Sequence, residues 1–180
     1  MLPAEVALPS LDRRLYQAIH GLPHYPLADR YVAMTSDVGE GLGWVAGGLA
    51  LAWVGGLKGR RAGLSTVVSS LAASYLVNRA LKPVFRRHRP FLASPATAYQ
   101  PLPTDASFPS GHTASSFAAA TALSVFYPKA APAFFSFASL VGFARVHLGH
   151  HFPSDVAAGA GIGIATGFFT AWLLRLPRAL

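Results

Sequence analysis

The chain has 180 residues, enough for one domain, and only 12% of them are Asp, Glu, Lys or Arg, against roughly a quarter in ordinary soluble proteins. Hydrophobic residues make up 52% and the mean hydropathy is +0.39. The chain therefore lacks the charged surface of a soluble domain and is predicted to lie in a membrane. Its net charge of +8 favours acidic partners such as anionic lipids or phosphorylated substrates, and the absence of cysteine excludes disulfides and thiolate chemistry.

The first 40 residues are too polar to cross a bilayer comfortably. They begin without a basic stretch followed by an apolar core, so no cleavable signal peptide is expected. The stretch LDRRLYQAIHGL has helical apolar spacing and predicts an amphipathic helix on the membrane surface, with one face formed by Leu11, Leu15, Ile19 and Leu22. Residues 1–40 are therefore interpreted as an N-terminal interfacial segment.

Five later segments contain no Asp, Glu, Lys or Arg, and with flanking residues most of them approach the roughly 20 residues that a spanning helix needs. They are Gly41–Leu57, Ala62–Asn78, Ala106–Pro128, Ala130–Ala144 and Val156–Leu174. The fourth reaches spanning length only by continuing to about Leu148, which puts Arg145 at the mouth of a helix. The sequence predicts an all-α polytopic membrane helix bundle of about five spanning helices over residues 41–176, within a single domain 1–180.

Glycine and proline mark two further features of the chain. Small residues let helices pack closely in lipid, and this interpretation applies to the glycines of the last segment, Gly159, Gly161, Gly163 and Gly167. Residues 90–109 contain five prolines and no helical period. Connections of this length are usually functional or disordered.

Polar residues gather in three clusters, each at an end of an apolar segment. Consecutive spans alternate in direction, so the end of the second, the start of the third, the end of the fourth and the start of the fifth share one membrane face. The clusters are Lys82–Pro90, Ser107–His112 and Arg145–Asp155. Alternation alone therefore predicts that all three meet.

The clusters contain the groups needed to bind a phosphate. Lys82, Arg89 and Arg145 supply three cations, and Arg suits forked contacts with phosphate oxygens. Ser110 and Gly111 lie at an expected helix start, where backbone N–H groups and the helix dipole favour an anion. Nucleic acid is not an expected partner, because the densest basic run lies between apolar segments and not on a polar arm.

Two histidines and a carboxylate complete the set. His151 and Asp155 are four residues apart, so they face each other on one helical turn. A carboxylate on one imidazole nitrogen leaves the other nitrogen free to attack phosphorus. His112 lies in another cluster and can approach from the opposite side as an acid for the leaving oxygen.

These clusters resemble the type 2 phosphatidic acid phosphatase superfamily, whose phosphate pocket is shared with vanadium-dependent haloperoxidases. The family pattern is Lys, six residues and Arg-Pro; then Pro-Ser-Gly-His; then Ser-Arg, five residues, His, three residues and Asp. The matching positions, in order, are Lys82, Arg89-Pro90, Pro109-Ser110-Gly111-His112, Arg145, His151 and Asp155. Ala144 departs from the family serine, which removes a hydroxyl contact. The resemblance covers about Ala62 to Leu174.

The resemblance implies roles for these residues. His151 would be the nucleophile, His112 the acid and Asp155 the group that orients His151, and the phosphate ligands would be Lys82, Arg89, Ser110, Gly111 and Arg145. It implies hydrolysis of a lipid phosphomonoester or diphosphate through a phosphohistidine, on the extracytoplasmic side of a bacterial inner membrane. Candidate substrates are isoprenyl diphosphate, phosphatidate and phosphatidylglycerol phosphate; an undecaprenyl-diphosphate-type carrier lipid or a glycerophospholipid phosphate is favoured. Counting Lys and Arg outside the motifs does not decide sidedness, because it gives six on each face.

No metal and no cofactor are expected in the reaction. His147 and His150 could contribute to a metal site, but no cysteine and few free carboxylates lie nearby, and the three cations would repel a divalent ion. His151 is preferred to His150 as nucleophile because His150 lies five residues from Asp155, roughly 140° around a helix. Arg86 and Arg87 do not fit the motif and are interpreted as interfacial anchors or headgroup contacts.

Two alternatives of other classes remain open. One is a non-catalytic lipid-phosphate-binding or lipid-moving membrane protein that keeps the anion pocket. The other is a haloperoxidase, and those that resemble this family are soluble. The complete set of two histidines and one carboxylate favours the phosphatase over the first, and the hydrophobic composition favours it over the second.

Overall fold

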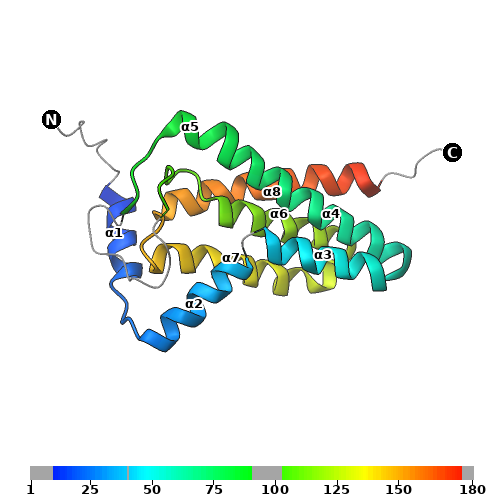
Figure 1. Cartoon of the computed structure of the whole chain (residues 1–180), viewed down its shortest axis with the longest axis horizontal. Helices are drawn as coiled ribbons and strands as arrows, with labels where there is room; N and C mark the ends of the chain where they lie inside the picture. Colours follow the sequence, from blue (N-terminus) through cyan, green and yellow to red (C-terminus); the bar gives the residue numbers. More distant parts are fainter. Residues whose placement is uncertain (1–9, 40, 91–102, 176–180) are drawn as a thin grey trace.

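The computed structural model describes residues 10–39, 41–90 and 103–175, and every regular element in these ranges is a helix (Figure 1). The N-terminal pair is α1 (Ser10–His20) and α2 (Pro26–Val38). The bundle that follows consists of α3 (Leu42–Val54), α4 (Gly56–Tyr75), the π-helical turn η1 (Leu76–Leu81), α5 (Lys82–Phe85), α6 (Gly111–Phe126), the 3-10 turn η3 (Pro128–Ala130), α7 (Ala131–His147) and α8 (Pro153–Arg175).

Helix α6 is the centre of the bundle. It packs against α4, α7 and α8, and twelve of its sixteen residues are buried, almost all of them Gly, Ala, Ser or Thr. Side chains this small let helix backbones approach closely without a large hydrophobic core. The position of α6 matters for the site, because its N-terminus carries the Pro-Ser-Gly-His motif.

The contact between α6 and α8 depends on glycine. A Cβ at Gly159, Gly163 or Gly167 would overlap a backbone carbonyl oxygen of α6 or of its N-cap, Ser110, so the prediction of a packing role is confirmed for these three. It is wrong for Gly161, where a Cβ would meet nothing within 4 Å. The reason is the helical period: steps of four keep the packing glycines on one face, and Gly161 lies on another.

The five apolar segments correspond to α3, α4 with η1, α6, α7 and α8. The N-terminal region differs from expectation, because it contains a second helix, α2, whose start is marked by Pro26 in the first turn. The two helices pack on α7, and α1 also contacts α8. Leu11 and Leu15 of the predicted apolar face are exposed, while Asp12 and Tyr16 point inward and are buried.

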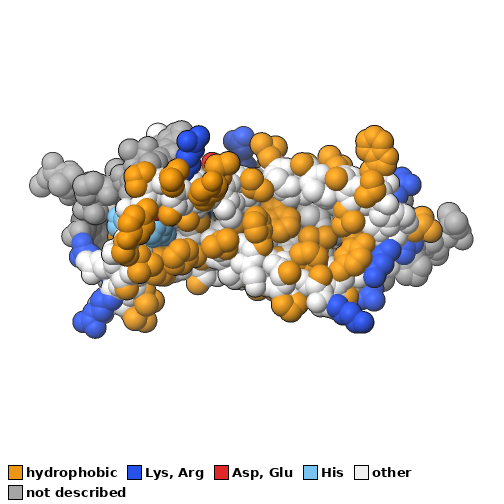
Figure 2. Space-filling view, turned by 90° about the horizontal axis from the view of Figure 1, so that it is seen from below, with side chains coloured by type: hydrophobic (Ala, Val, Ile, Leu, Met, Phe, Trp, Pro, Cys, Tyr) orange, Lys and Arg blue, Asp and Glu red, His pale blue; other side chains and the backbone are white. Residues whose placement is uncertain are grey.

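The surface of the bundle is apolar to an extent that suits lipid. Large hydrophobic side chains such as Trp53, Leu57, Phe168 and Trp172 are more than half exposed. In Figure 2 hydrophobic side chains spread over the visible face, and most Lys and Arg lie toward the two ends of the long axis. By length and composition one described helix, α8, is long and apolar enough to cross a membrane, and α3 is a shorter apolar helix.

Candidate active site

The three polar clusters meet at one end of the bundle, the end where α1 and α5 lie in Figure 1. Arg89, beyond α5, donates from Nη1 to the backbone carbonyl of His150 at 2.9 Å and to Nε2 of His151 at 3.2 Å. The N–H of Ser110, before α6, donates to the carbonyl of Asp155 at 3.0 Å. These bonds join segments that are 45 to 62 residues apart, as the alternation of spans predicted.

The three predicted phosphate-binding cations are all buried at this end. Lys82, Arg89 and Arg145 are 7%, 5% and 3% exposed. Burial lowers the pKa of Lys82, and the charges of Arg89 and Arg145 lower it further, against the opposing effect of Asp105. Three cations that are close enough to repel one another in a buried place create a strong preference for an anion.

Asp105 provides an anion from the protein itself, and sequence reasoning missed it. Its Oδ2 accepts from Lys82 Nζ at 2.5 Å and its Oδ1 accepts from Arg89 Nη2 at 2.6 Å. Burial alone would raise the pKa of Asp105, but the bonds and charges of Lys82 and Arg89 outweigh burial and lower it to about 2. The carboxylate thus bridges two predicted phosphate ligands, each with one oxygen, as two phosphate oxygens would.

A cleft leads to these cations from the side of α5. It has a volume of about 660 Å³. Its lining comprises Asn78, Lys82, Pro83, Arg86, Arg87, His88, Arg89, Pro103, Thr104, Asp105 and Ala106. Asp105 is half exposed at its wall, so an incoming phosphate can reach both cations by displacing one side chain.

His151 has the protonation state that a nucleophile requires. Arginine has only N–H donors, so its 3.2 Å contact from Arg89 requires a lone pair on Nε2 of His151. The ring proton then lies on Nδ1, which is 3.5 Å from Oδ2 of Asp155, a distance longer than a good hydrogen bond. Burial lowers the pKa of His151 well below its usual value, and nearby Arg89 and Arg145 lower it further, so the ring is neutral with Nε2 facing the cations.

Asp155 is completely buried and is held by donors from three directions. Arg87 Nη1 donates to Oδ1 at 2.5 Å, the N–H of Phe152 donates to Oδ2 at 2.8 Å, and the hydroxyl of Ser107 also donates to Oδ2. Charge-assisted hydrogen bonds are roughly twice as strong as neutral ones. These donors therefore hold the Asp155 carboxylate in place beside His151, where it can orient the ring.

The prediction that Arg87 is an interfacial anchor is wrong. Besides Asp155, Arg87 binds Asp12 of α1 through Nη2 at 2.6 Å and the hydroxyl of Ser154 at 2.7 Å. The cause is the end of α5, where Arg86 adopts a left-handed conformation with φ 46° and the helix terminates. The change of direction leaves Arg86 exposed and turns the next side chain inward, which motif spacing cannot show.

The start of α6 is positioned by its own cap. The hydroxyl of Ser110 accepts a bond from Thr113 Oγ1 at 2.9 Å and a longer one from the N–H of Thr113 at 3.4 Å. A Cβ at Gly111 would press against the side chain of Asn78, so glycine permits a close approach here. His112 follows in the first turn; burial and the charges of Arg145 and Arg89 lower the pKa of both His150 and His151, and His112 lies near enough to add to this effect.

The N-terminal helices contribute contacts that the interfacial interpretation did not foresee. Asp12 of α1 accepts from the N–H and the hydroxyl of Ser154 at 2.9 and 2.6 Å. Ser36 of α2 accepts from Arg145 Nη1 at 3.1 Å. Both helices therefore brace the residues around the predicted phosphate site.

The chain is similar to known proteins in sequence and in fold. Undecaprenyl-diphosphatase BcrC of Bacillus subtilis is 28% identical over 88% of this chain and 81% of its own length. LpxE of Aquifex aeolicus superposes with a TM-score of 0.73 and 28% identity, over 93% of this chain and 98% of its own. The transmembrane PAP2-type phosphatidylglycerolphosphate phosphatase of Bacillus subtilis shares the fold with a TM-score of 0.71 and 22% identity, over 98% and 90% of the two chains. A family model described as the PAP2 superfamily matches residues 63–178, well over half of the sequence, and the chain therefore belongs to the PAP2 superfamily.

Proposed function

We propose that this PAP2 protein, a membrane lipid phosphatase, hydrolyses a lipid phosphomonoester or diphosphate through a phosphohistidine on His151. One observation supports this most directly. A buried, neutral imidazole directs the lone pair of Nε2 at Arg89, within a group of three buried cations at the end of an apolar helical bundle. An imidazole placed in this way can attack the phosphorus of an anion that these cations bind.

Binding begins with exchange of one anion for another. The substrate phosphate displaces the Asp105 carboxylate from Lys82 and Arg89, and Arg145 and the N–H groups at the start of α6 take further phosphate oxygens. Nε2 of His151 then forms a bond to phosphorus while the bond from phosphorus to the lipid oxygen breaks. That oxygen leaves with the proton of His112, in line with the attacking nitrogen.

The second half of the reaction regenerates the enzyme. Water attacks the phosphorus of phosphohistidine and gives a proton to His112, and the nitrogen–phosphorus bond breaks to release phosphate. Asp155 stabilises the positive ring of His151 during both halves, because its charge stays in place through its three donors. No step draws on a metal ion or a cofactor.

The proposed membrane arrangement has five spans, α3, α4 with η1, α6, α7 and α8, in one domain. The exposed hydrophobic side chains of the bundle support it, and helices shorter than the bilayer are accommodated by local thinning or flanking residues. The N-terminal pair would lie at the membrane surface over the catalytic end. That end is proposed to lie on the side of a bacterial inner membrane that faces away from the cytoplasm.

Sidedness is tested with single cysteines, since the chain has none of its own. Thr104 is exposed at the catalytic end and Arg60 is exposed at the start of α4, at the opposite end. An impermeant thiol reagent on intact cells should label Thr104→Cys and leave Arg60→Cys unlabelled until the cells are opened. The reverse pattern would place the active site inside.

The activity is tested on purified protein with a panel of lipid phosphates. The panel contains undecaprenyl diphosphate, phosphatidate and phosphatidylglycerol phosphate, the first because a relative is an undecaprenyl-diphosphatase. Phosphate release should occur with at least one of them, should be blocked by vanadate, a five-coordinate phosphate mimic, and should continue in excess EDTA. Binding of these lipids without any phosphate release would favour the non-catalytic alternative.

A further inference from the structure

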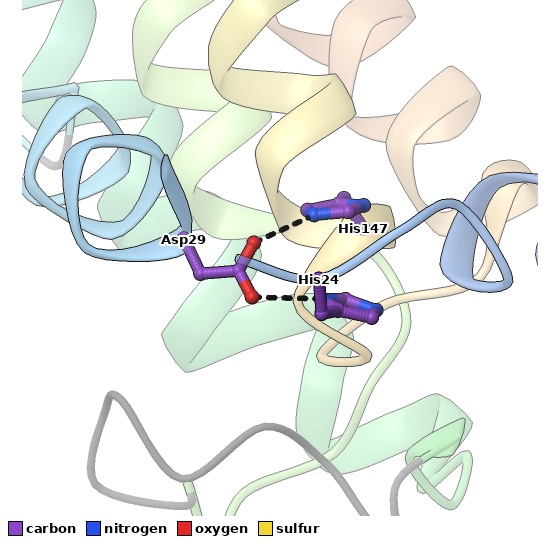
Figure 3. A group of neighbouring side chains, drawn as sticks. All are labelled: His24, Asp29 and His147. Carbon is purple, nitrogen blue, oxygen red and sulfur yellow. Dashed lines mark hydrogen bonds and ion pairs between the residues drawn. The ribbon is translucent and has the colours of Figure 1, made fainter. Parts of the chain in front are cut away.

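Three ionisable side chains form a second, largely buried cluster where the N-terminal helix pair meets the end of α7. His24 lies between α1 and α2, Asp29 lies in the first turn of α2, and His147 is the last residue of α7. Nδ1 of His24 is 2.9 Å from Oδ2 of Asp29, and Nε2 of His147 is 3.0 Å from Oδ1 (Figure 3). Asp29 is 1% exposed, so the two imidazoles enclose a carboxylate removed from water.

The other nitrogen of each ring faces a backbone carbonyl. Nε2 of His24 is 2.8 Å from the carbonyl of His20, and Nδ1 of His147 is 3.4 Å from the carbonyl of Ile19. A carbonyl oxygen only accepts, so the 2.8 Å contact places the ring proton of His24 on Nε2. In a neutral ring Nδ1 of His24 then holds a lone pair, and it points at a carboxylate oxygen of Asp29 that also only accepts.

Two arrangements remove this conflict. Protonation of His24 would do so, but it places an imidazolium ion against the ring of His147, which stacks on it with centroids 4.3 Å apart. A divalent cation bound by Nδ1 of His24, Nε2 of His147 and Asp29 also removes the conflict and leaves both rings neutral. Histidines that bind metals direct their second nitrogen at a carbonyl or carboxylate in the same manner.

We propose that His24, Asp29 and His147 bind one divalent transition-metal ion of the zinc class. Their three ligand atoms lie within 4.8 Å of one another, so small side-chain rotations bring them to the roughly 2.0–2.2 Å that such an ion requires. Two imidazole nitrogens and one carboxylate oxygen are a common ligand set for zinc, and water supplies a fourth position. The bound ion would take no part in the proposed reaction, and the proposal of a metal site does not depend on that reaction.

The ion would have a structural role. It would join the N-terminal helix pair to the end of α7, two residues beyond Arg145 and four before His151. Asp12 and Ser36 already contact Ser154 and Arg145 from the same pair. A metal here would stabilise the wall of the catalytic end without touching substrate.

The test uses full-length protein purified with a tag that contains no histidine, stripped with chelator and then given Zn²⁺ or Co²⁺. Metal content after removal of free ion should be one per chain, Co²⁺ should give the visible absorption of a tetrahedral site, and Zn²⁺ should raise the melting temperature. Asp29→Asn and His147→Gln should each weaken binding by at least about 100-fold, since loss of an outer partner alone costs 10–100-fold. The exposed His88, changed to Gln, is the matched control and should bind normally.

Asp29→Asn also discriminates between the two arrangements. An asparagine amide can donate to a histidine lone pair, so in a metal-free cluster this variant should melt at or above the wild-type temperature. Such a melting transition would also show that the variant folds. Absence of stoichiometric metal in the wild type, or undiminished binding in both ligand variants with elution as a single folded species, would overturn the proposal. Phosphate release in EDTA, measured well below the melting temperature, reports on the reaction separately.

Discussion

Two histidine–aspartate clusters flank the loop between α7 and α8, and only one of them has the features of a catalytic centre. His151 with Asp155 and His147 with Asp29 are both buried, and both pair an imidazole with a carboxylate. Nε2 of His151 faces a cation, whereas both nitrogens of His147 face oxygen atoms. The two clusters therefore share burial and a carboxylate partner, and they differ in the ring nitrogen that faces a buried cation, which supports His151 as the proposed nucleophile.

The carboxylates differ in the same way. Asp155 takes bonds from an arginine, a backbone N–H and a hydroxyl, which are donors at any ordinary pH. Within the described residues Asp29 is bonded through its side chain to the imidazole rings of His24 and His147. The first carboxylate is held by fixed donors, whereas the second depends on what its histidines bind.

The largest expected effect separates the two histidines. His151→Gln removes the nucleophile and should reduce turnover by at least about 10⁴-fold, as loss of a nucleophile does elsewhere. His147→Gln should keep readily measurable turnover and lower the melting temperature. The measurements are phosphate release and acid-quenched labelling for phosphohistidine, and a labelled phosphoenzyme in His151→Gln would show that another residue attacks.

The cations around His151 should be almost as important as the ring. Arg89→Lys and Arg145→Lys keep the charge but lose the paired N–H contacts of guanidinium, so each should reduce turnover by about 10²–10³-fold. Arg60→Lys, exposed at the opposite end, is the matched control. Near-normal rates in both test variants would mean that these arginines do not bind the reacting phosphate.

The effect of removing His112 should depend on the leaving group. An acid contributes about 10²–10⁴-fold when it protonates a poor leaving group, so His112→Ala should be severe on a lipid alkyl phosphate and milder on p-nitrophenyl phosphate. Asp155→Asn should reduce the turnover of both substrates alike, because it disturbs the proposed nucleophile and not the leaving group. Equal losses on both substrates in His112→Ala would exclude it as the acid.

The smallest effect is expected at Asp105, the anion supplied by the protein. Asp105→Asn removes the charge that competes with phosphate for Lys82 and Arg89, so inhibition by phosphate and vanadate should strengthen several-fold with little change in the maximal rate. Inhibition constants for wild type and variant provide the comparison. Weaker inhibition would mean instead that Asp105 holds the two cations in position.

The sequence by itself predicted the helical class, the approximate segments of the bundle and the meeting of its three polar clusters. These features depend on local properties: an apolar run of a given length forms a helix in lipid, and alternating direction decides which ends adjoin. The family spacing predicted Lys82, Arg89 and His151 as site residues for the same reason, and the structure brings these three side chains to one end of the bundle. Motif residues are recognised by their spacing along the chain, which does not depend on how the helices are rotated about their axes.

The tertiary structure decided which side chains outside the motifs join the site. Arg87 contacts Asp155 across 68 residues, Asp12 contacts Ser154 across 142, and His147 contacts Asp29 across 118. Each contact depends on the rotation of a helix about its axis or on a turn such as the one at Arg86. Rotation is determined by packing against neighbouring helices, and a hydrophobic pattern in lipid leaves it open because nearly every face is apolar.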